Sequence, residues 1–186
     1  MGLLKILTDN VDEPRRSQGL RTNLGQMFGM IIISNLCGHF GGRATAKFSK
    51  HYQSTFTELL KLKHPVPSHV IFSDLLNRAD ENQVIEAFNK WASKYVPLEK
   101  GELVSGDGKA LGSTVENAKN GKQTFTAIVS LFCQKSGLVH SLKQYQNAKK
   151  SEINIVRFLI KELNAKGLTL FFLMPFTFKN KQQKTL

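Results

Sequence analysis

The hydrophobic pattern of the sequence changes near Leu98, and this change limits the folds open to the chain more than any other feature. Before it, apolar residues recur every three or four positions, as on one face of a helix. After it, short apolar runs alternate with glycine-containing turns, which is typical of strands. The 186 residues are enough for two small domains. We therefore predict an α+β protein, with a helical domain over residues 21–97 and an α/β domain over residues 98–173.

The helical part is predicted to follow a polar lead-in. Residues 1–20 contain turn formers and little to bury. One helix is expected from Thr22 to about Phe40, in which Gly25 and Gly29 would allow close packing against a neighbour. A second helix is expected over residues 43–62. It would bury five apolar side chains, namely Phe48, Tyr52, Phe56, Leu59 and Leu60.

Two further helices are predicted after a break that is rich in proline. Pro65-Val66-Pro67 ends the helical pattern, and Ser68 is an N-cap candidate for a short helix. Asp80 and Gln83 have the spacing of a capping box for the next helix. That helix carries an apolar stripe, which we interpret as core rather than as a base-stacking surface: Val84, Phe88, Trp91 and Tyr95.

The α/β part is predicted to run strand, strand, strand, helix, strand, with a basic tail over residues 174–186. The expected elements are residues 103–107, 124–133, 138–145, 151–165 and 168–173. The first strand ends on Asp107, where a glycine turn begins. A carboxylate at the end of an apolar strand is unfavourable unless it is paired or binds a cation. Asp107 is therefore a candidate ligand for Mg²⁺.

The charge balance favours a polyanionic partner. The chain has 26 Lys and Arg against 14 Asp and Glu, a net charge of +12. Such an excess indicates a polyanionic partner, most simply nucleic acid, although a basic protein without such a partner stays equally open. The candidate DNA contacts are five basic residues: Arg15, Arg16, Arg21, Arg43 and Lys47. For the arginines of the lead-in, a solvated loop is the alternative.

Other classes of protein fit the sequence poorly. Cys37 and Cys133 lie far apart in apolar runs, without the spacing of zinc ligands. The longest apolar run, Met27 to Cys37, is too short to span a bilayer, and the first residues lack the pattern of a signal peptide. The glycines around Asp107 do not form a dinucleotide-binding motif. We therefore expect a cytoplasmic protein that binds neither a membrane nor a small-molecule substrate.

Four segments of the chain carry a family resemblance. They are Pro67-Ser68-His69-Val70-Ile71-Phe72, the helix with Phe88 and Trp91, the block from Ser105 to Ser113, and Lys150-Ser151-Glu152-Ile153. Their sequences and order resemble the H-repeat-associated insertion-sequence transposases of the DDE type, from about Glu13 to Leu170. The motif residues include Ser68, His69, Phe72, Trp91, Lys150 and Glu152.

The resemblance implies a fold and a chemistry. The helical part would be a transposase-associated domain that handles DNA, and the rest would be the start of a ribonuclease-H-like catalytic domain. Asp107 would be the first catalytic acid and a Mg²⁺ ligand, with Lys109 as a supporting residue near phosphate. Lys150 and Glu152 match a pattern beside the active site. An intact member would cleave and transfer insertion-sequence DNA ends in the bacterial cytosol, commonly as a homodimer.

The sequence departs from that family after the last predicted strand. The resemblance places a second catalytic aspartate there, but residues 168–186 contain neither Asp nor Glu, and the third acid is also absent. Read one base earlier from Leu173, the codons are compatible with Asp-Ala-Leu-His-x-Gln, which resembles the missing segment. We therefore hypothesise a frameshift in the gene.

Two functions stay open at the level of sequence. The first is a truncated, inactive DDE transposase that does not bind Mg²⁺ stably, because one aspartate cannot hold two such ions. The second is a non-catalytic DNA-binding protein derived from a transposase, such as an inhibitor of transposition.

Overall fold

The chain folds into two compact units, residues 1–94 and 95–186, which divide close to the change of pattern at Leu98. The computed structural model describes residues 2–17, 20–99, 101–111, 114 and 125–146, together with the backbone of residues 169–172.

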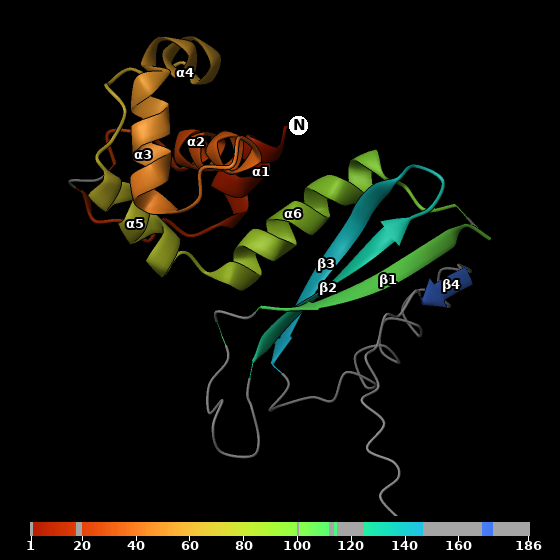
Figure 1. Ribbon diagram of the computed structural model, residues 1–186. Helices are drawn as coiled ribbons and strands as arrows, with labels where there is room; N and C mark the ends of the chain where they lie inside the picture. Colours follow the sequence, from red (N-terminus) through yellow and green to blue (C-terminus); the bar gives the residue numbers. More distant parts are fainter. Residues whose placement is uncertain are drawn as a thin grey trace, which may run out of the picture. The chain divides into compact units, whose positions relative to one another are not determined.

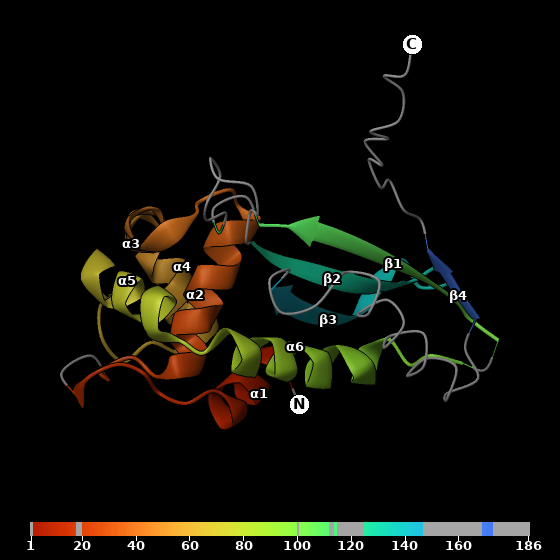
Figure 2. The same ribbon diagram turned by 90° about the horizontal axis from the view of Figure 1, so that it is seen from below.

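The first unit is built from helices, as predicted (Figure 1). Helix α2 lies against α1, α3 and α4 (Figure 2), and α3 also packs on α5. Their shared core contains, among others, Ile6, Met27, Met30, Phe72 and Leu75, each fully buried. The bounds are α1 Leu3–Asn10, α2 Leu24–Leu36, α3 Gly41–His51, α4 Gln53–Leu60, α5 His69–Arg78 and α6 Glu81–Tyr95.

The prediction of a polar lead-in over residues 1–20 was wrong, because residues 3–10 form α1. Ile6 and Leu7 are buried in the core. The apolar stripe is only two turns long, so α1 depends on packing rather than on intrinsic propensity. Gly25 and Gly29 of α2 permit this packing. A methyl group at Gly25 would come within 2.9 Å of a backbone oxygen of α1, which confirms the close approach expected of these glycines.

Helix α2 is shorter than the predicted helix, and its start has a clear cause. The side chain of Asn23 accepts a hydrogen bond from the backbone of Gln26 at 2.8 Å, and Gln26 Oε1 accepts one from the Asn23 backbone at 3.1 Å. This reciprocal pair is a capping box. At the other end, Gly38 has a φ of 82°, a conformation that favours glycine and ends the helix.

The helix predicted over residues 43–62 is two helices, because the chain leaves the helical conformation at Tyr52 (φ −101°, ψ 34°). Phe56 is buried as expected, and Phe48 and Leu60 pack against the core. The expected burial of Tyr52 and Leu59 was wrong, since they are 46% and 60% exposed. The break turns Tyr52 toward solvent.

The two later helix starts follow the sequence only in part. Ser68 occupies the N-cap of α5, but its side chain makes no capping hydrogen bond. Asp80 does cap α6, since its Oδ1 accepts hydrogen bonds from two backbone N–H groups of the first turn. Gln83 does not complete the box. Instead it exchanges two hydrogen bonds with Asp12, at 2.7 and 2.9 Å, and so connects α6 to the residues after α1.

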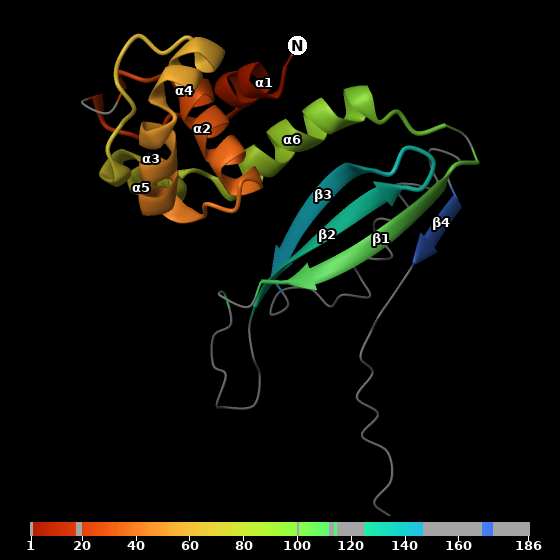
Figure 3. The ribbon, with the colours of Figure 1, turned by 45° about the horizontal axis from the view of Figure 1, so that its top comes forward.

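The second unit contains a sheet with the strand order β3-β2-β1-β4 (Figure 3). Strand β1 pairs antiparallel with β2, and β2 pairs antiparallel with β3, whereas β4 runs parallel to β1. The strands are β1 Leu103–Ala110, β2 Thr126–Cys133, β3 Leu138–Gln146 and β4 Thr169–Phe172. The four predicted strands are thus confirmed; the helix predicted over residues 151–165 lies outside the described residues.

The first strand differs from the prediction at its end. It was expected to end on Asp107, with a glycine turn after it, but β1 continues to Ala110 in register with β2. Alternation along the two strands separates an apolar face, which includes Val104, Val129 and Leu131, from a second face that carries Asp107 and Lys109. Asp107 therefore lies within a strand rather than at its end.

Candidate nucleic-acid interface

Three cations lie on one face of helix α3. Arg43, Lys47 and Lys50 occupy positions i, i+4 and i+7, and all three are exposed. Residues at these spacings are neighbours on a helix surface. On the opposite side, Thr45 and Ser49 are fully buried. The helix therefore has two different faces, with small uncharged polar side chains turned inward and long basic side chains turned outward.

The close packing of α3 on α5 fixes this orientation. At Gly42 an added methyl group would lie 2.8 Å from the backbone nitrogen of Ser73 and 3.1 Å from the backbone oxygen of His69. Backbone atoms of a packed helix cannot move aside easily. Gly42 thus holds the start of α3 against α5 and directs Arg43 and its neighbours to the surface.

Acidic residues do not neutralise this face. The sequence from Pro14 to Thr57 contains no Asp or Glu. Within the described ranges, neither Arg43 nor Lys47 nor Lys50 forms a salt bridge; the ion pairs there join other residues. We call Arg43, Lys47 and Lys50 the basic face of α3. Its charges are available to an anionic partner.

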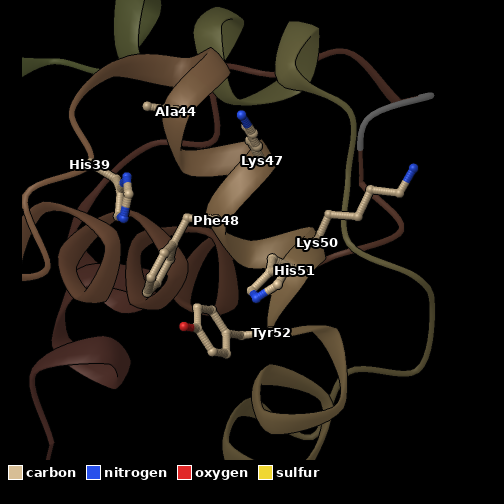
Figure 4. Close-up of a pocket in the computed structure, with 7 residues that line it drawn as sticks. All are labelled: His39, Ala44, Lys47, Phe48, Lys50, His51 and Tyr52. Carbon is tan, nitrogen blue, oxygen red and sulfur yellow. The ribbon is translucent and has the colours of Figure 1, made fainter.

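A shallow hollow of about 600 Å³ opens beside the basic face (Figure 4). The ring of His39 stacks on Phe48 with centroids 4.6 Å apart, and Phe48 lies 4.9 Å from Tyr52. The rings of His51 and Tyr52 are nearly perpendicular, at 88°, with centroids 4.7 Å apart. The hollow therefore combines a row of rings with cations. Its lining is His39, Ala44, Lys47, Phe48, Lys50, His51 and Tyr52.

The other basic residues proposed from the sequence are placed differently. The side chain of Arg15 is only 1% exposed, and its Nη2 donates to Glu13 Oε2 at 2.6 Å. Burial raises the pKa of Glu13, but the hydrogen bonds and charge of Arg15 outweigh it and hold that pKa below its ordinary value. This geometry favours a structural role for Arg15. Arg16 and Arg21 are exposed but lie outside α3.

Asp107 and Lys109 lie on the exposed face of β1, two residues apart and therefore on the same side of the strand. Asp107 stands opposite Ser130, whose Oγ donates to the Asp107 carbonyl at 3.4 Å. Strand β4, parallel to β1, pairs with residues 103–106. The two side chains implied by the resemblance thus share one solvent-facing surface.

The described residues do not supply the ligand set of a magnesium site. No group of three His, Cys, Asp or Glu side chains lies close enough within them to hold a metal ion. Asp107 contributes one carboxylate on an open strand face, and Mg²⁺ demands several oxygen ligands in octahedral order. Asp107 alone would therefore leave most ligand positions of the ion to water.

The remaining motif residues fall into two groups. Phe72 is fully buried in the core and Trp91 packs against it, so both stabilise the first unit. Ser68 and His69 are exposed at the start of α5. Lys150 and Glu152 lie outside the described residues.

Sequence reasoning missed much of the hollow. Lys50 could have been found, because it follows Lys47 by three positions on a predicted helix and extends the basic stripe. His39 and Tyr52 could not, since their exposure depends on the turn before α3 and on the break between α3 and α4.

Comparison with known proteins supports a relation to mobile elements. Residues 7–92 match the family model described as DDE_Tnp_1-associated. The match covers the second half of α1, all of α2 to α5 and most of α6, so α3 and its basic face lie within it. It points to a transposase-related protein of the DDE type. No curated protein and no solved structure matches the chain. None of the helices in the described part is long and apolar enough to cross a membrane.

Proposed function

We propose that this chain is a DNA-binding protein of DDE-transposase origin that contacts the DNA backbone through the basic face of α3. The observation that carries the proposal is the alignment of Arg43, Lys47 and Lys50 on one exposed helix face. The acid-free stretch from Pro14 to Thr57 and the net charge of +12 add to it. The match over residues 7–92 to a transposase-associated family model supports DNA as the polyanionic partner. Insertion-sequence ends are the DNA that the family resemblance suggests.

The physical basis is counterion release. Each lysine or arginine that neutralises a phosphate frees condensed cations from the duplex, which makes the affinity fall steeply with salt. Three aligned side chains on one helix can reach successive phosphates without rearranging the helix. This contact is independent of sequence, so base recognition would need further residues.

The experiment compares two triple variants of the full chain by fluorescence anisotropy on a labelled duplex. The test variant is Arg43→Gln/Lys47→Gln/Lys50→Gln. The control is Lys5→Gln/Lys90→Gln/Lys94→Gln, which removes the same charge from α1 and α6. We expect the test variant to lose at least tenfold in affinity and the control to stay within about threefold. Equal losses in both variants would show that only net charge matters and would contradict the proposal.

We also propose that the chain by itself does not cleave DNA. The support is chemical, since Asp107 is a lone carboxylate on its strand face and residues 168–186 contain no acid. The competing function is an active transposase. Nicking of an insertion-sequence end that requires Mg²⁺ and disappears in Asp107→Ala would establish that function instead. Binding as a homodimer and a cytoplasmic location remain predictions.

A further inference from the structure

From the geometry of the hollow, and resting on the DNA contact proposed above, we infer that it binds an unpaired nucleobase. The chain then prefers DNA with a single-stranded segment over a plain duplex. The hollow is lined by residues of α3, including Lys47 and Lys50 of its basic face, together with His39 before α3 and Tyr52 after it (Figure 4). Its size is within the range of about 300–1,000 Å³ that is usual for small-ligand sites.

The rings supply the surface on which a base can stack. His39 and Phe48 are stacked with an interplanar angle of 29°, and Phe48 continues the row to Tyr52. His39 is exposed, and Tyr52 is 46% exposed, so both present ring area to solvent. Base–aromatic stacking is the main source of affinity in single-strand binding that tolerates any sequence.

The cations supply the partner for the backbone on either side of the base. Lys47 and Lys50 line the hollow itself, and Arg43 lies one turn before Lys47 on the same face. A nucleotide whose base enters the hollow would keep its phosphates near these side chains. Rings beside lysines are the combination expected for a single strand, since each base has a flat face and each linkage a charge.

A paired base fits this site poorly. In a duplex both faces of each base are covered by its neighbours, so the base must leave the stack before it can lie on a protein ring. The unstacking is least unfavourable at an unpaired end. Duplex DNA can therefore use the basic face alone, whereas an unpaired segment can use the basic face and the hollow.

An acidic peptide is the competing occupant, because it too would be attracted by Lys47 and Lys50. Its carboxylate side chains have no flat ring that could stack on His39, Phe48 or Tyr52. The row of rings thus favours a nucleotide, and the peptide becomes an outcome of the test.

The experiment measures the affinity of the full chain for two labelled DNAs with equal numbers of phosphates, one a duplex and the other a duplex with a short unpaired flap. The variants are Tyr52→Leu, which keeps apolar volume but removes the ring, and Tyr52→Phe, which keeps the ring. The control is Tyr95→Leu, which changes another exposed tyrosine. Thermal unfolding of each variant confirms that it is folded.

We expect wild type, Tyr52→Phe and Tyr95→Leu to prefer the flap by roughly 5- to 100-fold. Tyr52→Leu loses that preference and keeps the duplex affinity. With 2-aminopurine at the unpaired position, the fluorescence changes on binding wild type and does not change with Tyr52→Leu. Equal affinity of wild type for both DNAs, or an unchanged preference in Tyr52→Leu, would overturn the inference. A third result would also overturn it: wild type binds a poly-glutamate peptide, Tyr52→Leu does not bind that peptide, and neither protein prefers the flap. The hollow would then be a binding site for a protein partner.

Failure of this inference is distinct from failure of the proposed function. If wild type shows no preference for the flap but the α3 charge variant still binds duplex DNA more weakly, the proposed duplex contact stands. Loss of the α3 effect on duplex DNA removes the basis of both.

Discussion

At the scale of single residues, Arg15 and Glu13 form a short ion pair around a buried guanidinium. The guanidinium is buried and makes hydrogen bonds to both carboxylate oxygens, at 2.6 and 2.7 Å. A buried charge that loses its partner is strongly destabilising, because it cannot recover its hydration. Glu13 is 31% exposed, which reduces the effect.

Glu13→Gln should therefore lower the free energy of unfolding by about 1–3 kcal/mol at pH 7. The measurement is urea unfolding followed by the fluorescence of Trp91, the single tryptophan of the chain. Asp74→Asn is the control, since its pair with Arg78 is longer, 3.3 Å, and exposed; it should change stability by no more than about 0.5 kcal/mol. Equal effects of the two variants would contradict the buried pair.

The same pair predicts a pH dependence. The folded-state pKa of Glu13 is lowered from its ordinary value of 4.5, so the stabilisation is present above that pH and is lost as the pH falls through the folded-state value. The difference between wild type and Glu13→Gln should thus be constant near neutral pH and shrink below about pH 4.5. A difference in the free energy of unfolding that grows in acid would mean that the pKa of Glu13 is raised rather than lowered by folding.

Gly42 offers a second test at this scale. Gly42→Ala raises helix propensity by about 1 kcal/mol, yet its methyl group would press on the backbone of α5. We expect a net loss of roughly 1–3 kcal/mol in thermal or urea unfolding. Gly2→Ala is the control, because nothing lies within 4 Å of its added methyl group. A stabilised Gly42→Ala would show that α3 and α5 can separate without loss.

At the scale of elements, Gln26 does more than its position in a capping box requires. Besides its bond with Asn23, its Nε2 donates to the backbone oxygens of Leu60 and Lys61 at 2.9 and 3.1 Å. It thereby satisfies carbonyls at the end of α4, where Lys61 has a left-handed φ of 54°. One side chain thus joins the start of α2 to the end of α4.

This arrangement predicts unequal effects of two substitutions. Asn23→Ala removes a cap and should reduce stability by about 1 kcal/mol. Gln26→Ala removes the reciprocal cap and both bonds to the end of α4, so it should reduce stability by more, about 2 kcal/mol. Urea unfolding measures both. A smaller effect for Gln26→Ala would mean that the link to α4 does not contribute.

The elements also show what a sequence can and cannot predict. The strands were found because alternation and turn residues are local signals, as in Thr126–Cys133. Helix α1 was missed because Ile6 and Leu7 gain their stability from α2, which no local pattern reveals. The division at Tyr52 was missed because the apolar spacing continues through it.

The candidate site was predicted to a similar extent. Arg43 and Lys47 were identified from charge alone, and the structure adds Lys50 beside them. Arg15 was grouped with them because the sequence does not show that its side chain is buried and paired with Glu13. Asp107 was placed at a strand end because Gly108, which follows it, is typical of turns; pairing with β2 instead keeps Gly108 in the strand.

At the scale of the whole molecule, the frameshift hypothesis concerns the gene rather than the fold. It requires the codon of Leu173 to end in G, because only then does the earlier frame read aspartate across Leu173 and Met174. The nucleotide sequence tests this directly. A codon ending in A, C or T would exclude the frameshift at this position, and the proposed DNA contact of α3 would be unaffected.

The central claim is that the basic face of α3 is where the chain neutralises DNA phosphates. Its most direct test is the slope of log K against log salt concentration for duplex binding. Each phosphate contact contributes about 0.9 to that slope. Wild type and the variant with Lys5, Lys90 and Lys94 changed to Gln should share a steep slope. Arg43→Gln/Lys47→Gln/Lys50→Gln should be shallower by roughly two to three units. A slope unchanged in the α3 variant would contradict the account.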